Sequence, residues 1–386
     1  MGLPSSRTRR EAIIVGLVVH EWIEPHGGSE RVLEVIADTF PTSDIVVPWN
    51  NAPWRHITPR VTESWLASTP IRDRKAMAAV ALPMVWRTVV DRRKEYEWVL
   101  ASSHLFSHHV RAKGAGGDAP KFVYVHSPAR YIWNPELDDR GKGPIARVVG
   151  AGLKPIDRRR AKEARSIAAN SAFVKARVEQ AWQRDAVVIH PPVDVQRIID
   201  GRRWRDRLTP QEEAVLAALP AQFVLGASRF VSYKRLDLVV RAGEASGLPV
   251  VLAGDGPLRA ELELLAAEAS VPVVFVESPG SALLYALYES AAVYVFPPVE
   301  DFGMMPVEAM AAGTPVIANA VGGARESVRP GVNGVLVERF DAAELQRAVH
   351  AAAALDRSRI PDSVLDFSVQ SFQRRLEDWV QTGLGA

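Results

Sequence analysis

Short apolar runs that alternate with helical stretches constrain the fold of this chain more than any other feature. The strand candidates are continuous runs of mostly β-branched and aromatic residues, as in Val250–Ala253 and Val293–Phe296, and helical stretches such as Leu258–Ala267 separate them. A strand that is apolar on both faces belongs inside a parallel sheet that helices cover on both sides. The sequence therefore predicts an α/β fold made of doubly wound parallel sheets.

The alternating pattern occurs twice, with an interruption at His190–Asp194 and a basic, polar segment at 196–211. The chain has 386 residues, and single cores rarely grow beyond about 250 residues. We therefore expect two Rossmann-like domains, 1–194 and 195–366, with a deep cleft between them, and a closing helix in 367–386 that packs back on the first domain. The expected strands are Ile13–Val19, Trp98–Ala101, Lys121–Val125, Ser166–Ala169, Ala186–Ile189, Phe223–Ala227, Val250–Ala253, Val273–Val276, Val293–Phe296 and Val316–Ala318.

Composition excludes several classes of function. The chain has no cysteine and a formal net charge of +2, so thiol chemistry and disulfides are excluded and nothing favours nucleic acid as a partner. The longest apolar run, Ala76–Trp86, is well short of the ~20 residues of a membrane-spanning helix. The basic segment Met1–Arg10 is not followed by the apolar region of a signal peptide. We expect a protein of the cytoplasm, either free or at the inner face of the membrane.

Glycines and cations follow several of the expected strands. Gly27 and Gly28 come after the first strand and open a helix, and Gly254 lies in a strand-to-helix turn. Glycine lets the backbone approach a ligand, and a helix N-terminus favours anions. Arg229 and Lys234 follow the strand Phe223–Ala227, where two cations suit a diphosphate and the charge that develops as it leaves. Each feature alone is also compatible with a tight turn or a solvated basic loop.

Two glutamates form the most informative pair. Glu300 lies in the loop after Val293–Phe296, Gly303 permits a turn, and Glu308 falls in or near the first turn of the next helix. The spacing places one carboxylate in a loop and the other on a helix, where both can accept hydrogen bonds from the hydroxyls of a polyol. The alternative is that Glu308 only complements the helix dipole.

Histidines are the next candidates. His126 follows the strand Lys121–Val125, with Arg130 close behind. Its position at a strand end raises the odds of a functional role, with a satisfied structural histidine as the alternative. His108 and His109 are adjacent in the sequence and do not form a metal-binding motif. Asp138-Asp139 is the only acidic pair that resembles one, and it lies in a polar segment.

Residues 300–318, EDFGMMPVEAMAAGTPVIA, resemble the signature segment of retaining GT-B enzymes of glycosyltransferase family 4. The form of the segment His126–Tyr131 is similar to the subgroup of O-antigen and capsule mannosyltransferases. Other matches occur in the family's order along nearly the whole chain: Gly27–Arg31, His126–Tyr131, Asn170-Ser171, Pro191–Asp194, Ser228-Arg229, Tyr233–Arg235, Gly254–Pro257, Gly322-Gly323 and Gly331–Gly334.

The resemblance implies a role for each matching position. Glu308 would bind the ribose of a nucleotide-sugar donor, and Glu300 would hold the transferred sugar with the backbone amides near Phe302 and Gly303. Arg229 and Lys234 would grip the diphosphate. The remaining donor contacts would come from Gly27, Gly28, Gly254, Asp301 and Met304, and the catalytic group would comprise His126, Glu300, Arg229 and Lys234.

The resemblance implies a hexosyltransferase that needs neither a metal nor a cofactor. It moves a hexose, with mannose as the first expectation, to a glycan, a lipid-linked or a small-molecule acceptor. GDP-mannose is the favoured donor and a UDP-hexose the alternative, because the segment Glu277–Gly280 departs from the family pattern near the base. Two other classes remain: a catalytically silent subunit that binds nucleotide sugars, and an NAD-dependent oxidoreductase. The absence of a G-x-G-x-x-G fingerprint disfavours the oxidoreductase.

The acceptor side has few motifs. Four tryptophans of the first domain are candidates for an acceptor or lipid-contact surface, although ordinary packing explains them equally well: Trp49, Trp54, Trp65 and Trp86. A basic stretch from Lys154 to Arg165 suggests peripheral contact with membrane phosphates, with a solvated helix face as the alternative.

Overall fold

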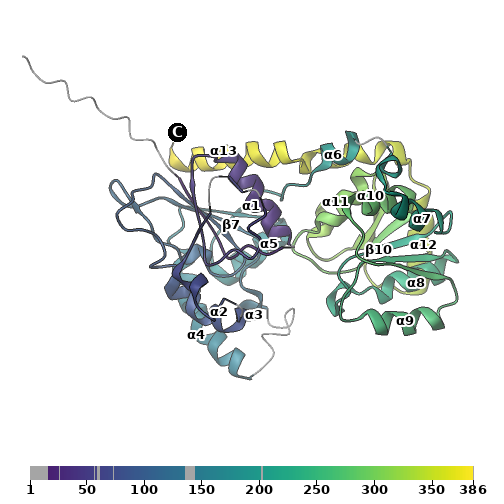
Figure 1. The fold of residues 1–386 in the computed structure, drawn as a ribbon, viewed down its shortest axis with the longest axis horizontal. Coiled ribbons are helices and arrows are strands. Elements are labelled where there is room, and N and C mark those ends of the chain that lie inside the picture. Colours follow the sequence, from purple (N-terminus) through teal and green to yellow (C-terminus); the bar gives the residue numbers. More distant parts are fainter. Residues whose placement is uncertain are drawn as a thin grey trace, which may run out of the picture.

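The chain folds into two α/β units that lie side by side (Figure 1). The computed structural model describes residues 16–25, 27–55, 57–58, 61–72, 74–134, 144–200 and 203–385. Each unit contains a parallel sheet with helices on its faces, as the continuous apolar runs predict. The α/β fold with two Rossmann-like domains is therefore confirmed.

The N-terminal unit contains a seven-stranded sheet in the order β3-β2-β1-β4-β7-β8-β9, and all its neighbouring strands run parallel. The strands are β1 (Leu17–His20), β2 (Asp44–Val47), β3 (Val61–Glu63), β4 (Val99–Ser103), β7 (Lys121–Val125), β8 (Ser166–Ala169) and β9 (Val187–Val188). The helices are α1 (Gly28–Thr39), α2 (Lys75–Val85), α3 (Arg130–Trp133), α4 (Pro144–Ala161) and α5 (Ala172–Trp182). Every residue of β1, β4 and β7 is buried, so these strands form the centre of the sheet.

The C-terminal unit contains a six-stranded parallel sheet in the order β12-β11-β10-β13-β14-β15. The strands are β10 (Val224–Ala227), β11 (Val250–Ala253), β12 (Val273–Val276), β13 (Val293–Phe296), β14 (Val316–Asn319) and β15 (Gly334–Val337). The helices are α6 (Val195–Asp200), α7 (Pro210–Ala217), α8 (Asp237–Ser246), α9 (Arg259–Glu268), α10 (Ser281–Ser290), α11 (Met304–Ala311) and α12 (Ala342–Ala353). The sheet order reverses between β10 and β13, and doubly wound sheets bind ligands at such a point.

The last helix, α13 (Val369–Leu384), returns to the N-terminal unit and runs along its top in Figure 1. Its apolar face carries Phe372, Leu376 and Trp379, which join the hydrophobic core beside β1 and β7. The indole N–H of Trp379 also donates to the hydroxyl of Ser166 at 2.8 Å. The helix thus ties the C-terminal end of the chain to the first sheet.

The structure also contains elements that the sequence pattern did not indicate. Strands β2, β3 and β15 were not expected. A small antiparallel hairpin of β5 (Lys113–Gly114) and β6 (Gly117–Asp118) was not expected either. The first expected strand begins at Ile13, but 13–15 lie outside the described residues. Among the helices that the structure describes, none is long and apolar enough to cross a membrane.

Candidate functional site

The loops that follow β7 and β8 of the first sheet meet the loop that follows β13 of the second. Arg130, which comes after β7, pairs with Asp301, and the hydroxyl of Ser171, which comes after β8, donates to the carbonyl oxygen of Asp301. The carboxyl-end loops of both sheets therefore converge on residues 300–303. This is where α/β folds place their ligands.

The loop 300–303 is held on its own side by two glycines. The N–H of Gly323 donates to the carbonyl oxygen of Glu300 at 2.8 Å. A Cβ at Gly323 would lie 2.0 Å from the carbonyl oxygen of Asp301, so only glycine permits this approach. Gly303 has φ 87° and is the N-cap residue that precedes α11. The sequence places these glycines where the backbone must turn tightly beside the charged loop.

Lys234 and Glu300 form an ion pair within the C-terminal unit. Their side chains are 13% and 19% exposed, so the pair is largely shielded from water. Arg229, the other predicted diphosphate ligand, is exposed, and no ion pair joins it to another described residue. The structure thus brings Lys234 to Glu300 and leaves the guanidinium of Arg229 available on the surface.

Glu308 is buried and pairs with the opposite unit. It lies in the second turn of α11, slightly beyond the predicted first turn. Its carboxylate accepts a hydrogen bond from Nη1 of Arg31 at 2.7 Å. Arg31 belongs to α1 of the N-terminal unit, so this contact spans the two units. The sequence places Arg31 in the motif Gly27–Arg31, but nothing in its spacing predicted Glu308 as the partner.

Helices α1 and α11 begin next to each other. A Cβ at Gly28, the first residue of α1, would lie 2.9 Å from Cε of Met304, the first residue of α11. Both helix N-termini therefore border the same space, close to Arg31 and Glu308. Each N-terminus carries partial positive charge and free backbone N–H groups, which makes this space favourable for an anion.

His126 lies at the end of β7 in a network of buried polar groups. Its Nε2 is 2.8 Å from the hydroxyl of Ser102, which is 2.9 Å from Nδ1 of His20. Asn170 donates to the carbonyl oxygen of His126 at 3.1 Å. Burial, with a smaller contribution from His20, lowers the pKa of His126 to about 3. The imidazole is therefore neutral near pH 7 and can serve in hydrogen bonding but not as a cation.

The buried histidines predict that acid destabilises the fold. Burial lowers the pKa of His20 to about 4 and, together with His108, that of His109 to about 4. Below their ordinary pKa of 6.5, the unfolded chain binds protons that the folded protein does not. Each of these two histidines and His126 then lowers the free energy of unfolding by about 1.4 kcal/mol per pH unit.

Glu21 and Glu289 act in the opposite direction, because burial raises the pKa of each carboxyl. Together they offset at most two of the three protons, so acidification still lowers the stability. We expect the melting temperature to fall steadily between about pH 6.5 and pH 5. Thermal melts followed by circular dichroism across this range measure the effect. A constant or rising melting temperature would contradict the assignment of neutral buried histidines.

Other predicted site residues have packing roles in the structure. A Cβ at Gly254 would lie 2.0 Å from the carbonyl oxygen of Ser228, so this glycine supports the loop that carries Arg229. The Phe302 ring is buried with its centroid 5.4 Å from that of His190. Gly27 is the residue before α1, and a Cβ there would lie 2.0 Å from a carboxylate oxygen of Glu30.

The predictions for the acceptor side are only partly supported. Trp49 and Trp86 are fully buried, so they cannot line a surface, whereas Trp54 and Trp65 are exposed. Part of the basic stretch from Lys154 to Arg165 makes internal contacts: Arg158, for example, donates to the carbonyl oxygen of Ala181. The pair Asp138-Asp139 lies outside the described residues.

A buried cluster of two histidines and an aspartate lies in the core of the N-terminal unit. Nε2 of His108 and Nε2 of His109 lie 3.1 Å and 3.0 Å from one oxygen of Asp157. The other oxygen accepts the indole N–H groups of Trp133 and Trp182, both at 2.7 Å. These three side chains are close enough to hold a metal ion, but the carboxylate already has a protein partner at each oxygen. We interpret the cluster as a structural hydrogen-bond network.

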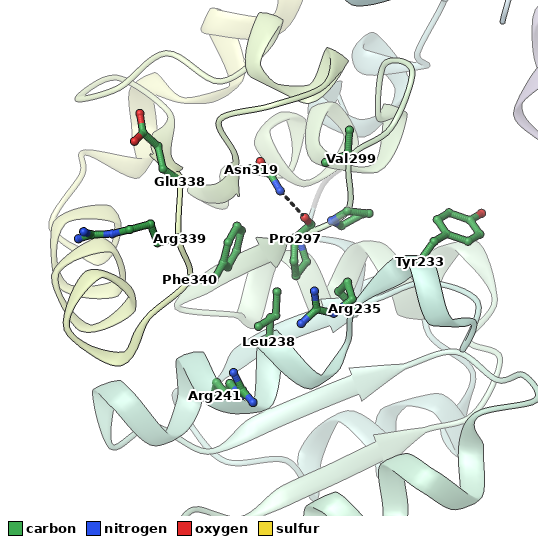
Figure 2. A pocket seen from close by; sticks show the side chains of 11 residues that line it. Tyr233, Arg235, Leu238, Arg241, Pro297, Val299, Asn319, Glu338, Arg339 and Phe340 are labelled. Carbon is green, nitrogen blue, oxygen red and sulfur yellow. Dashed lines mark hydrogen bonds between the residues drawn. The ribbon is translucent and has the colours of Figure 1, made fainter. Parts of the chain in front are cut away.

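A cavity of about 390 Å³ lies in the C-terminal unit behind the loops that carry Lys234 and Glu300. Figure 2 shows that Tyr233, next to Lys234 in the chain, and Val299, next to Glu300, line this cavity. It also shows the hydrogen bond that the side-chain amide of Asn319 donates to the carbonyl oxygen of Pro297. All its lining residues belong to the C-terminal unit. The cavity is therefore separate from the junction of the two units.

Comparison with known proteins relates the chain to glycosyltransferases. A family model described as glycosyl transferases group 1 matches residues 211–359, the segment that contains Arg229, Lys234, Glu300 and Glu308. The D-inositol 3-phosphate glycosyltransferase of Geodermatophilus obscurus is 33% identical over 243 residues, which cover 55% of this chain and 49% of that protein. The chain thus spans about half the length of the curated relatives it matches.

Two solved structures share the fold over nearly the whole chain. HepE of Anabaena in complex with UDP-glucose has a TM-score of 0.67 and 17% identity, covering 96% of this chain and 100% of that one. Sucrose-phosphate synthase of Thermosynechococcus elongatus has a TM-score of 0.70 and 20% identity, covering 96% and 98%. At these identities the likeness shows the GT-B fold alone.

Proposed function

We propose that this chain is a retaining glycosyltransferase of family 4 that transfers a hexose from a nucleoside diphosphate sugar. One observation carries the proposal: the Lys234–Glu300 pair, the buried Glu308 and the N-termini of α1 and α11 gather where the two units meet. This combination offers carboxylates for sugar hydroxyls beside cationic groups for a diphosphate. The group 1 match over 211–359 supports it.

The proposed donor lies between the two units, with its diphosphate at the helix N-termini. Arg229 and Lys234 bind the diphosphate, assisted by the backbone at Gly28 and Met304. Glu300 and the amides near Phe302 and Gly303 hold the hexose. These groups stabilise the negative charge that grows on the diphosphate as the sugar leaves.

The ribose of the proposed donor binds Glu308, which requires a rearrangement. Arg31 occupies this carboxylate in the structure, so the ribose hydroxyls must displace it. The freed guanidinium then lies beside the diphosphate, where its charge is favourable. His126 contacts the sugar as a neutral hydrogen-bonding group.

The proposed reaction retains the configuration of the sugar. The leaving phosphate oxygen takes the proton of the attacking acceptor hydroxyl, so the chain needs no separate base. The side chains of the chain then bind and orient the donor and stabilise the charge on the diphosphate. We propose that no metal takes part. The unit 1–194 receives the acceptor, and the unit 195–366 binds the donor.

We propose a chemical class of molecule for the donor and another for the acceptor. GDP-mannose remains the favoured donor from the motif resemblance, and HepE, whose structure holds UDP-glucose, supports a UDP-hexose as the second candidate. The acceptor is a glycan, a lipid-linked or a small molecule. Two curated relatives are named D-inositol 3-phosphate glycosyltransferases. We therefore include a phosphorylated polyol among the small-molecule acceptors to be tested.

We also propose that the N-terminal unit contacts the cytoplasmic face of a membrane when its acceptor is lipid-linked. Trp54, Trp65, Val80 and Met84 expose more than half of their surfaces. Exposed aromatic and aliphatic side chains insert favourably at the lipid interface. Cosedimentation with anionic vesicles measures this contact.

A panel of nucleotide sugars tests the donor assignment by thermal shift. A ligand that binds only the folded protein, at ~100 times its Kd, stabilises it by ~2.7 kcal/mol. We expect a clear rise in melting temperature with either GDP-mannose or a UDP-hexose, a smaller rise with the free nucleoside diphosphate, and none with NAD. Stabilisation by NAD alone would support the oxidoreductase instead.

A further inference from the structure

The carboxylate of Asp301 is occupied by two arginines of the opposite unit. Nη1 of Arg177, in α5, donates to one oxygen at 2.6 Å, and Arg130, at the start of α3, pairs with the other oxygen. The side chains of Asp301 and Arg177 are only 15% and 8% exposed. Sequence reasoning placed Asp301 among the donor ligands, but in the structure both its oxygens face the protein.

Arg177 is held in place by its own neighbours. Its Nε and Nη2 both donate to the side-chain oxygen of Asn134, at 3.1 Å and 2.8 Å. This leaves Nη1 directed at Asp301. A guanidinium that two hydrogen bonds to Asn134 already fix loses little further conformational entropy when it binds a carboxylate. The arginine is therefore a rigid support for the loop that it contacts.

The same helix also holds the loop through backbone contacts. Ser171, the N-cap of α5, donates its hydroxyl to the carbonyl oxygen of Asp301. The first two N–H groups of α5, of Ala172 and Phe173, donate to the carboxylate of Glu326 at 2.8 Å and 3.0 Å. Glu326 ends the short 3-10 helix η7 (Gly323–Glu326), whose first N–H binds the carbonyl oxygen of Glu300.

Helix α5 therefore reaches the loop 300–303 from two directions, directly and through η7. Figure 1 shows α5 on the side of the N-terminal unit that faces the C-terminal unit. The ion pairs between a partly buried carboxylate and two arginines are costly to break, because removing one partner leaves an unpaired charge away from water. The position of the loop thus depends on contact between the two units.

We propose that Asp301, Arg130 and Arg177 are positioning residues that hold the sugar-binding loop in its productive geometry. The proposal rests on the proposed function, because it assigns the loop to the transferred hexose. When the N-terminal unit contacts Asp301, it fixes the position of the loop and therefore the positions of Glu300 and of the amides of Phe302 and Gly303. Contact between the units then sets the geometry of the sugar site, while binding of the nucleotide part depends on other residues.

Steady-state kinetics test the proposal with three variants: Asp301→Asn, Arg177→Gln and the double variant. We expect each single variant to lower kcat by ~10-fold or more, because a loop displaced by about 1 Å loses that much or more. The Kd of the free nucleoside diphosphate should change by less than ~3-fold, and the double variant should be no worse than the worse single one, since the residues act as one unit. Arg177→Lys, which keeps the charge, should recover part of the activity.

A large rise in the Kd of the nucleotide sugar at unchanged kcat in Asp301→Asn would overturn the proposal, because it would make Asp301 a direct donor ligand. Additive losses in the double variant would overturn it as well. A wild-type protein that turns over no nucleotide sugar would count against the proposed function instead.

Amide hydrogen exchange provides a readout that does not depend on activity. Exchange in peptides that cover 297–308 should be faster in Arg177→Gln, although the substitution lies in the other unit, while peptides from β10 and β11 stay unchanged. Melting temperatures confirm that the variants are folded. Unchanged exchange in 297–308 would refute the positioning role.

Discussion

Replacing Lys234 with alanine is expected to lower sugar transfer by about 10²–10³-fold, the usual loss when one preorganised charge-stabilising group is removed. Lys234 pairs with Glu300 in a largely shielded position and is the proposed cation next to the leaving diphosphate. Glu300→Ala should have a similar effect, because it removes the proposed sugar ligand and leaves Lys234 without its partner. Initial rates with saturating donor measure both losses.

The matched control is Arg241→Ala. Arg241 is an exposed cation in α8 that lines the separate cavity, and no ion pair joins it to another described residue. Its removal should leave transfer close to the wild-type rate. Near-wild-type turnover in Lys234→Ala and Glu300→Ala, with both variants folded, would refute the site assignment.

Replacing Asp157 with alanine is expected to produce the largest loss of stability. The residue is fully buried, and its two oxygens face His108, His109, Trp133 and Trp182. Removing a buried carboxylate leaves these polar groups unsatisfied, at a cost of about 3–5 kcal/mol. This is a large part of the stability of a typical domain, about 5–15 kcal/mol. Chemical denaturation followed by tryptophan fluorescence measures the change.

Asp378→Ala serves as the control for Asp157. Asp378 is an exposed aspartate in α13, and its replacement should change the free energy of unfolding by less than about 0.5 kcal/mol. Asp157→Asn keeps the shape and one acceptor oxygen, so an intermediate loss is expected. A loss below about 1 kcal/mol for Asp157→Ala would show that the network contributes little, since buried unsatisfied polar groups alone cost about that much or more.

The sequence predicted the parallel sheets because central strands have a simple signal. β10, β11 and β13 are buried along their whole length, so their residues are apolar without alternation. Edge strands lack this signal. β3 has one half-buried and two exposed residues, and its sequence, Val-Thr-Glu, does not stand out from a loop. Its place in the sheet depends on pairing with β2, which local pattern does not encode.

The sequence predicted the site residues that belong to local motifs. It did not predict the residues that join the site through contacts between the two units. Glu300 and Glu308 stood out by their spacing after a strand. The partner of Glu308 is Arg31, 277 positions away, and no local pattern connects the two. Arg177 lies in a helical stretch and has the sequence appearance of a solvated arginine, and only the packed structure shows that it holds Asp301.

The decisive measurement is the release of a nucleoside diphosphate from a nucleotide sugar by the purified protein. We expect the wild-type protein to release GDP from GDP-mannose or UDP from a UDP-hexose, faster in the presence of acceptor and without added metal. Glu300→Ala should release almost none. A folded wild-type protein that neither binds nor cleaves any nucleotide sugar of the panel would refute the proposed glycosyltransferase function.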